Sequence, residues 1–197
     1  ASRTDAMVSA NHNAFELFVG KACNTDVLHH DFNKNLPNDI RVNKVQIVGP
    51  EFNIIQAPKF KEYRYLFSCG RKEHPFCASL VCSFQEILDI DLMKQGARLF
   101  EGTHDFKQYC TKPSSGTQLK RTVDLSVIEK NSEIDAGFFP SQTWVYKVKS
   151  KGFMRNQVRL MMGQLLRLGR GIINLDDIRH SLTGEEKTPL PMIVPAS

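Results

Sequence analysis

The pattern of hydrophobic and polar positions predicts strands along much of the chain. Runs rich in aromatic and β-branched residues are typical of strands, and alternation is clearest where Val123, Leu125 and Val127 share one face. Trp144, Tyr146 and Val148 alternate in the same way. We predict strands at residues 14–19, 40–48, 63–69, 119–129 and 143–149.

Helical spacing is strongest from Met154 to Gly169, where apolar residues recur three and four positions apart. Capping residues and helix-ending residues add shorter helices at 25–36, from 89 or 91 to 101, and at 176–182. Strands mixed with a few helices predict an α+β protein. We expect two mixed or antiparallel sheet halves with helices packed outside, meeting at a cleft, with the boundary near residues 55–60.

Composition narrows the class of protein. The 197 residues are 41% hydrophobic and 24% charged, which is ordinary for a globular protein and excludes collagen-like and disordered chains. Arg or Lys interrupts every apolar stretch before it reaches the roughly 20 residues of a membrane span. The odd count of five cysteines and the lack of an apolar leader favour the reducing cytoplasm.

Charge is distributed unevenly, although the net value is only +5. No Asp or Glu occurs at 136–175 or at 106–123, and both windows carry several Lys and Arg residues. Such segregation is typical of a face that binds a polyanion, with nucleic acid the leading candidate. The alternative is a solvated surface on which the charges cluster by chance.

Motifs for nucleotide, dinucleotide and acyl-transfer chemistry are absent from the sequence, so we expect no cofactor. Cys69, Cys77, Cys82 and His74 lie close in sequence, but zinc sites normally use two tight cysteine pairs and only one pair has suitable spacing. We therefore expect no metal, and we interpret residues 77–82 as a buried strand.

Three segments carry candidate chemistry, each beside a simpler interpretation. Arg3-Thr4-Asp5 presents a carboxylate in a turn, although an Asp there often just caps the turn. Residues 61–65 place two tyrosines on one face of a strand, which a cross-strand aromatic pair also explains. Residues 152–159 open the strong helix with two arginines one turn apart, and Arg159 either points into a cleft or lies along the surface.

Together these segments resemble the TruA-type tRNA pseudouridine synthases. The family's catalytic motif is matched by residues 2–10 and its N-x-x-L-P-x-D-I motif by residues 33–40. Its tyrosine strand is matched by Tyr63 and Tyr65, and its G-x-H/N-D-F segment by residues 102–106. The last motif, F-x-x-x-x-V-R-x-x-x-G, is matched by Phe153, Val158, Arg159 and Gly163. The resemblance extends from position 2 to about position 170.

The resemblance implies an isomerase that converts uridine to pseudouridine in tRNA, with the anticodon stem-loop as the expected region. Asp5 would be the nucleophile, Arg159 its charge partner, and Tyr63 the residue that stacks on the flipped base. Arg3 would fill the place of that base or hold a flanking phosphate. The other substrate-binding candidates are Phe153, Lys107, Lys147, Lys149, Arg155 and Arg170.

Three departures from the family pattern stand out. The Arg usually found in the H-A-R-F-like stretch before the tyrosine strand is missing, and residues 52–57 read F-N-I-I-Q-A instead. Met7 replaces the usual Gly after the catalytic Asp-Ala, so the turn cannot rely on the freedom of glycine at positive φ. The chain also begins on the catalytic motif, where family members carry a leader, so we expect a fragment of a longer enzyme. Residues 1–58 would be the remainder of the N-terminal catalytic half and residues 59–197 the C-terminal half.

The resemblance also implies a homodimer with tRNA spanning both subunits. The sequence leaves two rival interpretations open. One is a catalytically silent RNA-binding module of the same fold, which shares every basic-patch argument and differs only in turnover. The other is a structural α+β protein whose motif matches arise by chance.

Overall fold

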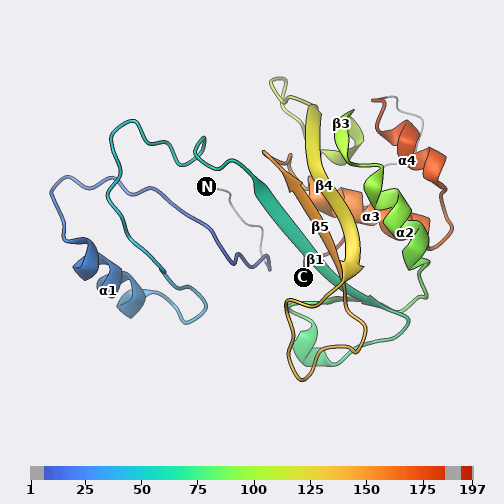
Figure 1. Ribbon diagram of the computed structural model, residues 1–197, viewed down its shortest axis with the longest axis horizontal. Coiled ribbons are helices and arrows are strands. Elements are labelled where there is room, and N and C mark those ends of the chain that lie inside the picture. Colours follow the sequence, from blue (N-terminus) through green and yellow to red (C-terminus); the bar gives the residue numbers. More distant parts are fainter. Residues whose placement is uncertain (1–6, 185–191, 197) are drawn as a thin grey trace. The chain divides into compact units, whose positions relative to one another are not determined.

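The structure, a computed structural model, describes residues 7–184 and 192–196 (Figure 1). The described chain divides into two compact units. The smaller unit is formed by residues 10–58, and the larger by residues 59–184 and 192–196 together with residues 7–9.

A five-stranded mixed sheet organises the larger unit. Its strands are β1 (Lys61–Cys69), β2 (Cys82–Phe84), β3 (Gly102–Asp105), β4 (Lys120–Lys130) and β5 (Trp144–Ser150), arranged in the order β2-β1-β5-β4-β3. β1 and β2 pair in parallel, and the other neighbours are antiparallel. Tyr63 lies opposite Val148 and Tyr65 opposite Tyr146, so these side chains share one face of the sheet.

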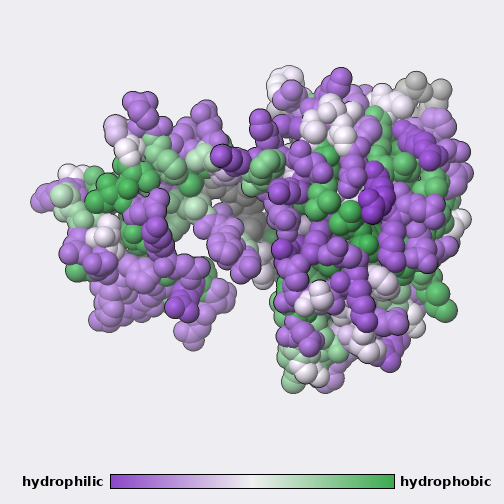
Figure 2. All heavy atoms as spheres, in the orientation of Figure 1, coloured by the Kyte–Doolittle hydropathy of each residue, from purple (hydrophilic) through white to green (hydrophobic). Residues whose placement is uncertain are grey.

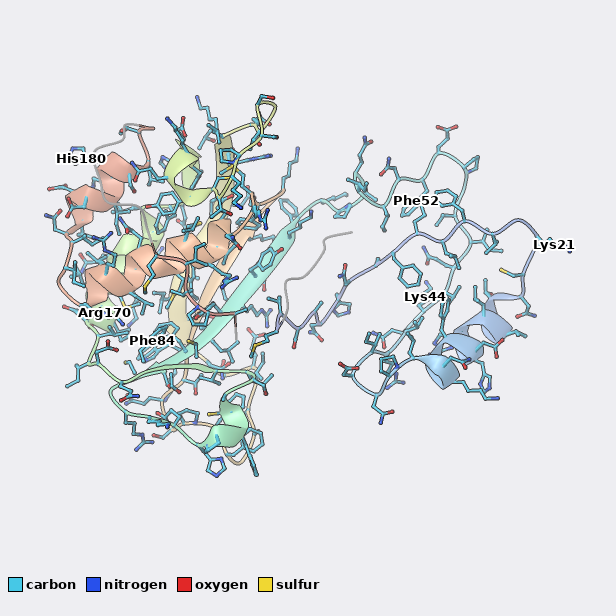
Figure 3. The ribbon with its side chains drawn as sticks, turned by 180° about the vertical axis from the view of Figure 1, so that it is seen from behind. Lys21, Lys44, Phe52, Phe84, Arg170 and His180 are labelled. Carbon is cyan, nitrogen blue, oxygen red and sulfur yellow. The ribbon has the colours of Figure 1, made fainter. Side chains whose placement is uncertain are left out.

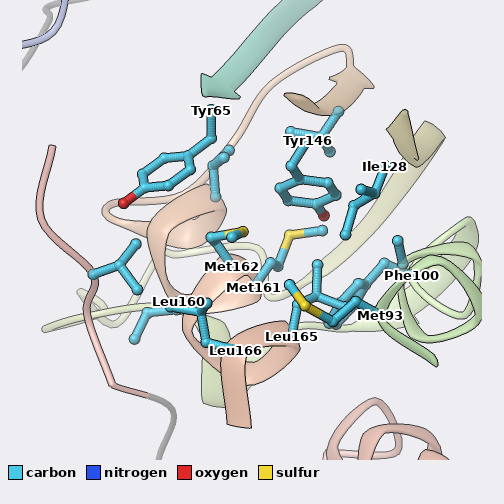
Figure 4. Packing of buried hydrophobic residues seen from close by; sticks show 14 of the residues in the cluster. Tyr65, Met93, Phe100, Ile128, Tyr146, Leu160, Met161, Met162, Leu165 and Leu166 are labelled. Carbon is cyan, nitrogen blue, oxygen red and sulfur yellow. The ribbon is translucent and has the colours of Figure 1, made fainter. Parts of the chain in front are cut away.

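Helices α2 (Ile90–Arg98) and α3 (Gln157–Gly169) cover that face, and α4 (Leu175–Ser181) packs against α2 (Figure 1). α3 is the central one, because almost all of its side chains are buried and several pack beneath Tyr65 and Tyr146 (Figure 4). Asp89 caps α2 through the Leu92 amide, and Asn174 forms a capping box with Asp177 at the start of α4. The predicted α+β class and the external helices are confirmed.

The smaller unit contains one described helix, α1 (Thr25–Asn35), which has no buried residue. Asn24 caps this helix, because its side-chain oxygen accepts hydrogen bonds from the Asp26 and Val27 amides. Asn33, the first residue of the N-x-x-L-P-x-D-I motif, binds both backbone groups of Val42: its Nδ2 donates to the carbonyl at 2.9 Å and its Oδ1 accepts from the amide at 2.9 Å. This motif residue therefore ties α1 to the segment that follows it.

The strands predicted at 14–19 and 40–48 are wrong for the described structure, where both segments are irregular. Phe18 is 86% exposed and Ile47 is 81% exposed, and Figure 2 shows hydrophobic side chains on the surface of this unit. High β-propensity makes a strand only when a neighbour supplies the hydrogen-bonding ladder. Neither segment finds such a neighbour among the described residues.

Two further predictions need correction. Residues 77–82 are not a strand, because Pro75 begins a short 3₁₀-helix, Pro75–Cys77. His74 caps this helix, and its Nδ1 accepts a hydrogen bond from the Phe76 amide at 3.2 Å. Strand β2 begins only at Cys82. The helix predicted from Met154 begins at Gln157, because Asn156 adopts a left-handed conformation with φ +60°. Arg155 therefore lies in a turn, and it is not one helical turn from Arg159.

Within residues 7–184 and 192–196, no helix is long and apolar enough to cross a membrane. In the same part of the chain, no three His, Cys, Asp or Glu side chains come together as metal ligands would. Cys77, from the segment considered for zinc, is buried, and its thiol donates to the carbonyl of His74 at 2.9 Å.

Candidate active site

The turn that follows the predicted nucleophile keeps an unusual backbone. Asp5 and Arg3 lie outside the described residues, but Met7 is described and has φ +64°. This left-handed conformation costs a residue with a Cβ roughly 1–2 kcal/mol, and glycine avoids that cost. Met7 therefore adopts its positive φ against the steric resistance of its own Cβ.

Tyr63 and Phe153 lie against each other on the helix-covered side of the sheet. Their ring centroids are 5.2 Å apart and the rings meet edge to face at 89°. Both side chains are half-buried and pack against the main core. The predicted base-stacking tyrosine and the predicted substrate-binding phenylalanine are thus brought together from β1 and from the turn before α3.

Arg159 extends from the first turn of α3 toward the C-terminal end of the chain. Its Nε donates to the carbonyl of Val194 at 2.7 Å, and its side chain is half-buried. Burial raises the pKa of the Tyr65 hydroxyl far above its usual range, and the nearby Cys82 adds to this, whereas the positive charge of Arg159 opposes it. Arg159 is therefore close to the same face of β1 that carries Tyr63.

The two acid-free sequence windows meet in the folded chain. The Thr111 amide donates to the Arg155 carbonyl at 3.3 Å, and Asn156 Nδ2 donates to Thr111 Oγ1 at 2.9 Å. Burial raises the pKa of the Cys110 thiol, while a backbone hydrogen bond from Arg155 and the charge of Arg121 oppose that rise. Cations from both windows, including the exposed Arg155 and Lys107, consequently belong to one region of the larger unit.

Arg121 is not among the substrate-binding residues predicted from the sequence, although it lies in the acid-free window 106–123. Its Nε is buried and has no hydrogen-bond partner in the described part of the chain. Across the β3–β4 ladder it lies opposite His104 of the G-x-H/N-D-F segment. The acid-free window was the signal that pointed to it.

The predicted phosphate contacts differ in how their charge is compensated. Lys147 lies between Glu129 and Glu133, with Glu133 Oε1 at 2.6 Å, and hydrogen bonds to both carboxylates raise the pKa of Lys147. Arg170, at the end of α3 (Figure 3), pairs with Glu86 at 2.9 Å. Lys149 instead lies over the Phe60 ring, 4.6 Å from its centroid. The ion pairs argue against free phosphate contacts at Lys147 and Arg170.

Comparison with known proteins identifies the family. The sequence model of the family described as tRNA pseudouridine synthase matches residues 97–197. The chain is 31% identical over 196 residues to tRNA pseudouridine synthase A of Staphylococcus aureus (strain MRSA252), which covers 100% of this chain and 71% of that protein. It is 30% identical over 196 residues to the protein of the same name from Staphylococcus carnosus (strain TM300), covering 100% and 70%.

A further relative, tRNA pseudouridine synthase A of Shouchella clausii (strain KSM-K16), is 29% identical over 164 residues, covering 83% of this chain and 59% of that protein. The chain belongs to the tRNA pseudouridine synthase family, a family of isomerases. The predicted family and enzyme class are confirmed.

Proposed function

We propose that this chain isomerises uridine to pseudouridine in tRNA, with Asp5 as the nucleophile. Two observations support this most: Tyr63 and Phe153, from separate motifs, lie edge to face, and Arg159 lies near Tyr65, two residues along β1 from Tyr63. Family membership and the names of the relatives support the same activity. The chemistry needs a carboxylate, a base-binding face and a cation.

The reaction exchanges one glycosidic bond for another. The bond between C1′ of the ribose and N1 of the uracil breaks, the base turns, and C1′ joins C5. The C5 hydrogen leaves as a proton and N1 gains one, so substrate and product are isomers. Nothing is oxidised, and no group is added to or lost from the RNA.

In this scheme the chemistry is divided among five residues. Asp5 attacks during the step that detaches the base, and Arg159 holds that carboxylate ionised and aimed. Tyr63 stacks on the extruded uracil and relays the C5 proton, and Phe153 supports the Tyr63 ring from the side. Arg3 occupies the place of the flipped base or holds a flanking phosphate. The Asp5 carboxylate thus acts together with a cation that keeps it ionised and an aromatic ring that binds the base.

Substrate binding follows from the meeting of the two acid-free windows. We propose that Lys107, Arg155 and Lys149 contact tRNA phosphates, with binding that weakens as salt rises. The anticodon stem-loop as the modified region and a homodimer as the working form are further proposals, and both come from the family resemblance. A cytoplasmic location is supported by five unpaired cysteines.

Replacing Tyr63 with Phe separates stacking from proton transfer. The Tyr63→Phe variant keeps the aromatic face, so tRNA should bind and the base should flip, while turnover falls by roughly 10²–10⁴-fold because the proton relay is lost. Rapid-mixing measurements with tRNA that carries a fluorescent uridine analogue separate the two steps. Tyr63→Ala should impair both. Equal turnover of Tyr63→Phe and the wild type would remove the hydroxyl from the mechanism.

Charge changes at two neighbouring lysines of β5 test the binding proposal. Lys149→Glu should weaken tRNA binding and flatten the slope of log affinity against log salt by about one. Lys147→Gln is the matched comparison, two residues away on the same face, because Glu129 and Glu133 already compensate that charge. It should lower thermal stability and leave the salt slope unchanged. The proposed interface is contradicted if Lys149→Glu leaves both affinity and slope intact.

Covalent trapping tests turnover against the silent RNA-binding module. A tRNA containing 5-fluorouridine cannot lose a proton from C5, so an active nucleophile should give a protein–RNA adduct whose slow gel mobility is lost on denaturation by heat. We expect this adduct with the wild-type chain. If the chain binds this tRNA and gives neither an adduct nor a product, the silent module is the better account.

A further inference from the structure

We propose that the C-terminal segment, residues 192–196, is a positioning element of the candidate active site. Its backbone carbonyls accept hydrogen bonds from Arg159 and Tyr65, and its backbone packs closely against α3 at Gly163. This inference rests on the proposed function, because it assigns to the segment the task of orienting the residue that aims the nucleophile.

Two consecutive carbonyls of the C-terminal segment bind side chains from two different elements. The Val194 carbonyl accepts from Arg159 Nε of α3 at 2.7 Å, and the Pro195 carbonyl accepts from the Tyr65 hydroxyl of β1 at 3.0 Å. In Figure 4 the hydroxyl of Tyr65 points out of the core cluster. A guanidinium is planar and its donors have fixed directions, so a hydrogen bond at Nε sets the plane in which the whole group lies.

The segment lies so close to α3 that only glycine fits at position 163. A Cβ built on Gly163 would lie 1.8 Å from the carbonyl oxygen of Met192 and 2.9 Å from its carbonyl carbon. Both atoms are backbone, so neither can turn aside as a side chain would. Gly163 lies four residues after Arg159, on the same side of the helix. The C-terminal segment thus passes over Gly163 and reaches the guanidinium one turn earlier.

The amino-acid sequence of the segment suits this task. Val194 precedes Pro195, and the residue before a proline is restricted to extended conformations. An extended backbone presents its carbonyls to neighbours and does not bind them internally. The Val194 side chain is completely buried, which anchors the segment against the core between its two hydrogen bonds.

This arrangement also explains a motif position. A glycine inside a helix is about 1 kcal/mol less favourable than alanine, so its presence at 163 needs a reason. The reason is the close approach of the Met192 backbone, and its benefit is the fixed orientation of Arg159. Gly169 provides a contrast in the same helix, since the three nearest atoms to a Cβ there all belong to side chains: the Met93 sulfur at 2.5 Å, Met93 Cγ at 2.8 Å and Leu88 Cβ at 3.5 Å.

The test is Gly163→Ala with Gly169→Ala as its matched control, both in the full chain. Both variants add the same methyl group to α3, one inside the helix and the other at its last residue. Gly163→Ala should displace the C-terminal segment and lower kcat by about 10²-fold with tRNA affinity unchanged, because the reacting groups are slightly misplaced. Gly169→Ala should keep the kcat of the wild type. Equal kcat values for wild type and Gly163→Ala would overturn the inference.

A second measurement does not depend on turnover. In NMR spectra, the Nε–H of Arg159 should exchange slowly with water in the wild type and in Gly169→Ala, and fast in Gly163→Ala. Unchanged slow exchange in Gly163→Ala would overturn the inference, even if the chain proved unable to form pseudouridine. That separates this inference from the proposed function, which fails if the wild-type chain gives no product.

If Gly163→Ala does not fold, the Tyr65→Phe variant tests the positioning role of the C-terminal segment instead. It removes the hydroxyl that binds the Pro195 carbonyl and interacts with the Cys82 thiol, and it keeps the ring in the core. We expect kcat to fall by about tenfold, the equivalent of one hydrogen bond, with Arg159 Nε–H exchange accelerated. Wild-type values of both would overturn the inference.

Discussion

Asp5→Asn is expected to abolish pseudouridine formation while tRNA binding survives. Asparagine keeps the size and hydrogen-bonding capacity of the side chain and loses the charge that makes it a nucleophile. The expected loss of kcat is on the order of 10⁴-fold or more, as for other residues that act directly in bond making. Single-turnover kinetics and filter binding measure the two quantities separately.

The matched control for this variant is Asp124→Asn, an equivalent change at an exposed position of β4. It should leave both turnover and affinity at wild-type values. A loss of tRNA binding in Asp5→Asn equal to its loss of turnover would mean that Asp5 supports the turn and does not act in the reaction. Retained turnover would remove Asp5 from the mechanism entirely.

Arg159→Lys is expected to lower kcat by about 10²-fold. Lysine keeps the positive charge but has no Nε–H and no planar fork, so it loses both the hydrogen bond to the Val194 carbonyl and the means to aim a carboxylate. The control is Arg167→Lys, an arginine two turns further along α3. It should retain wild-type kcat.

A pH profile distinguishes an electrostatic role for Arg159 from a merely structural one. A neighbouring cation favours the ionised carboxylate, so its removal in Arg159→Gln should move the acid side of the pH–rate profile to higher pH. Arg159→Lys, which keeps the charge, should show the slower rate with less displacement of that limb. An acid limb identical in wild type and Arg159→Gln would show that Arg159 does not act on the nucleophile through its charge.

The sequence predicted the larger unit well because its signals are local and agree with its packing. Period-two alternation located β4 and β5, and the helical spacing after Met154 located α3, whose apolar face is the centre of the core. Even there the start of α3 was missed by three residues. The local pattern of residues does not predict that Asn156 adopts a left-handed backbone conformation.

The smaller unit and the site details were predicted less well, for physical reasons. Segments 14–19 and 40–48 have strand composition, but a strand also requires a partner that composition cannot supply. The Lys147 ion pairs depend on Glu129 and Glu133, whose approach follows from the strand register and the loop after β4. The contact between Gly163 and Met192 joins positions 29 residues apart, and only the folded chain reveals it.

Release of tritium from tRNA labelled at C5 of uridine tests the central claim most directly. The new glycosidic bond replaces the C5–H bond, so each pseudouridine formed releases one label into water. The account predicts tritium release by the wild-type chain, and none by Asp5→Asn at equal tRNA occupancy. Binding of the labelled tRNA by the wild-type chain without any release of tritium would contradict it.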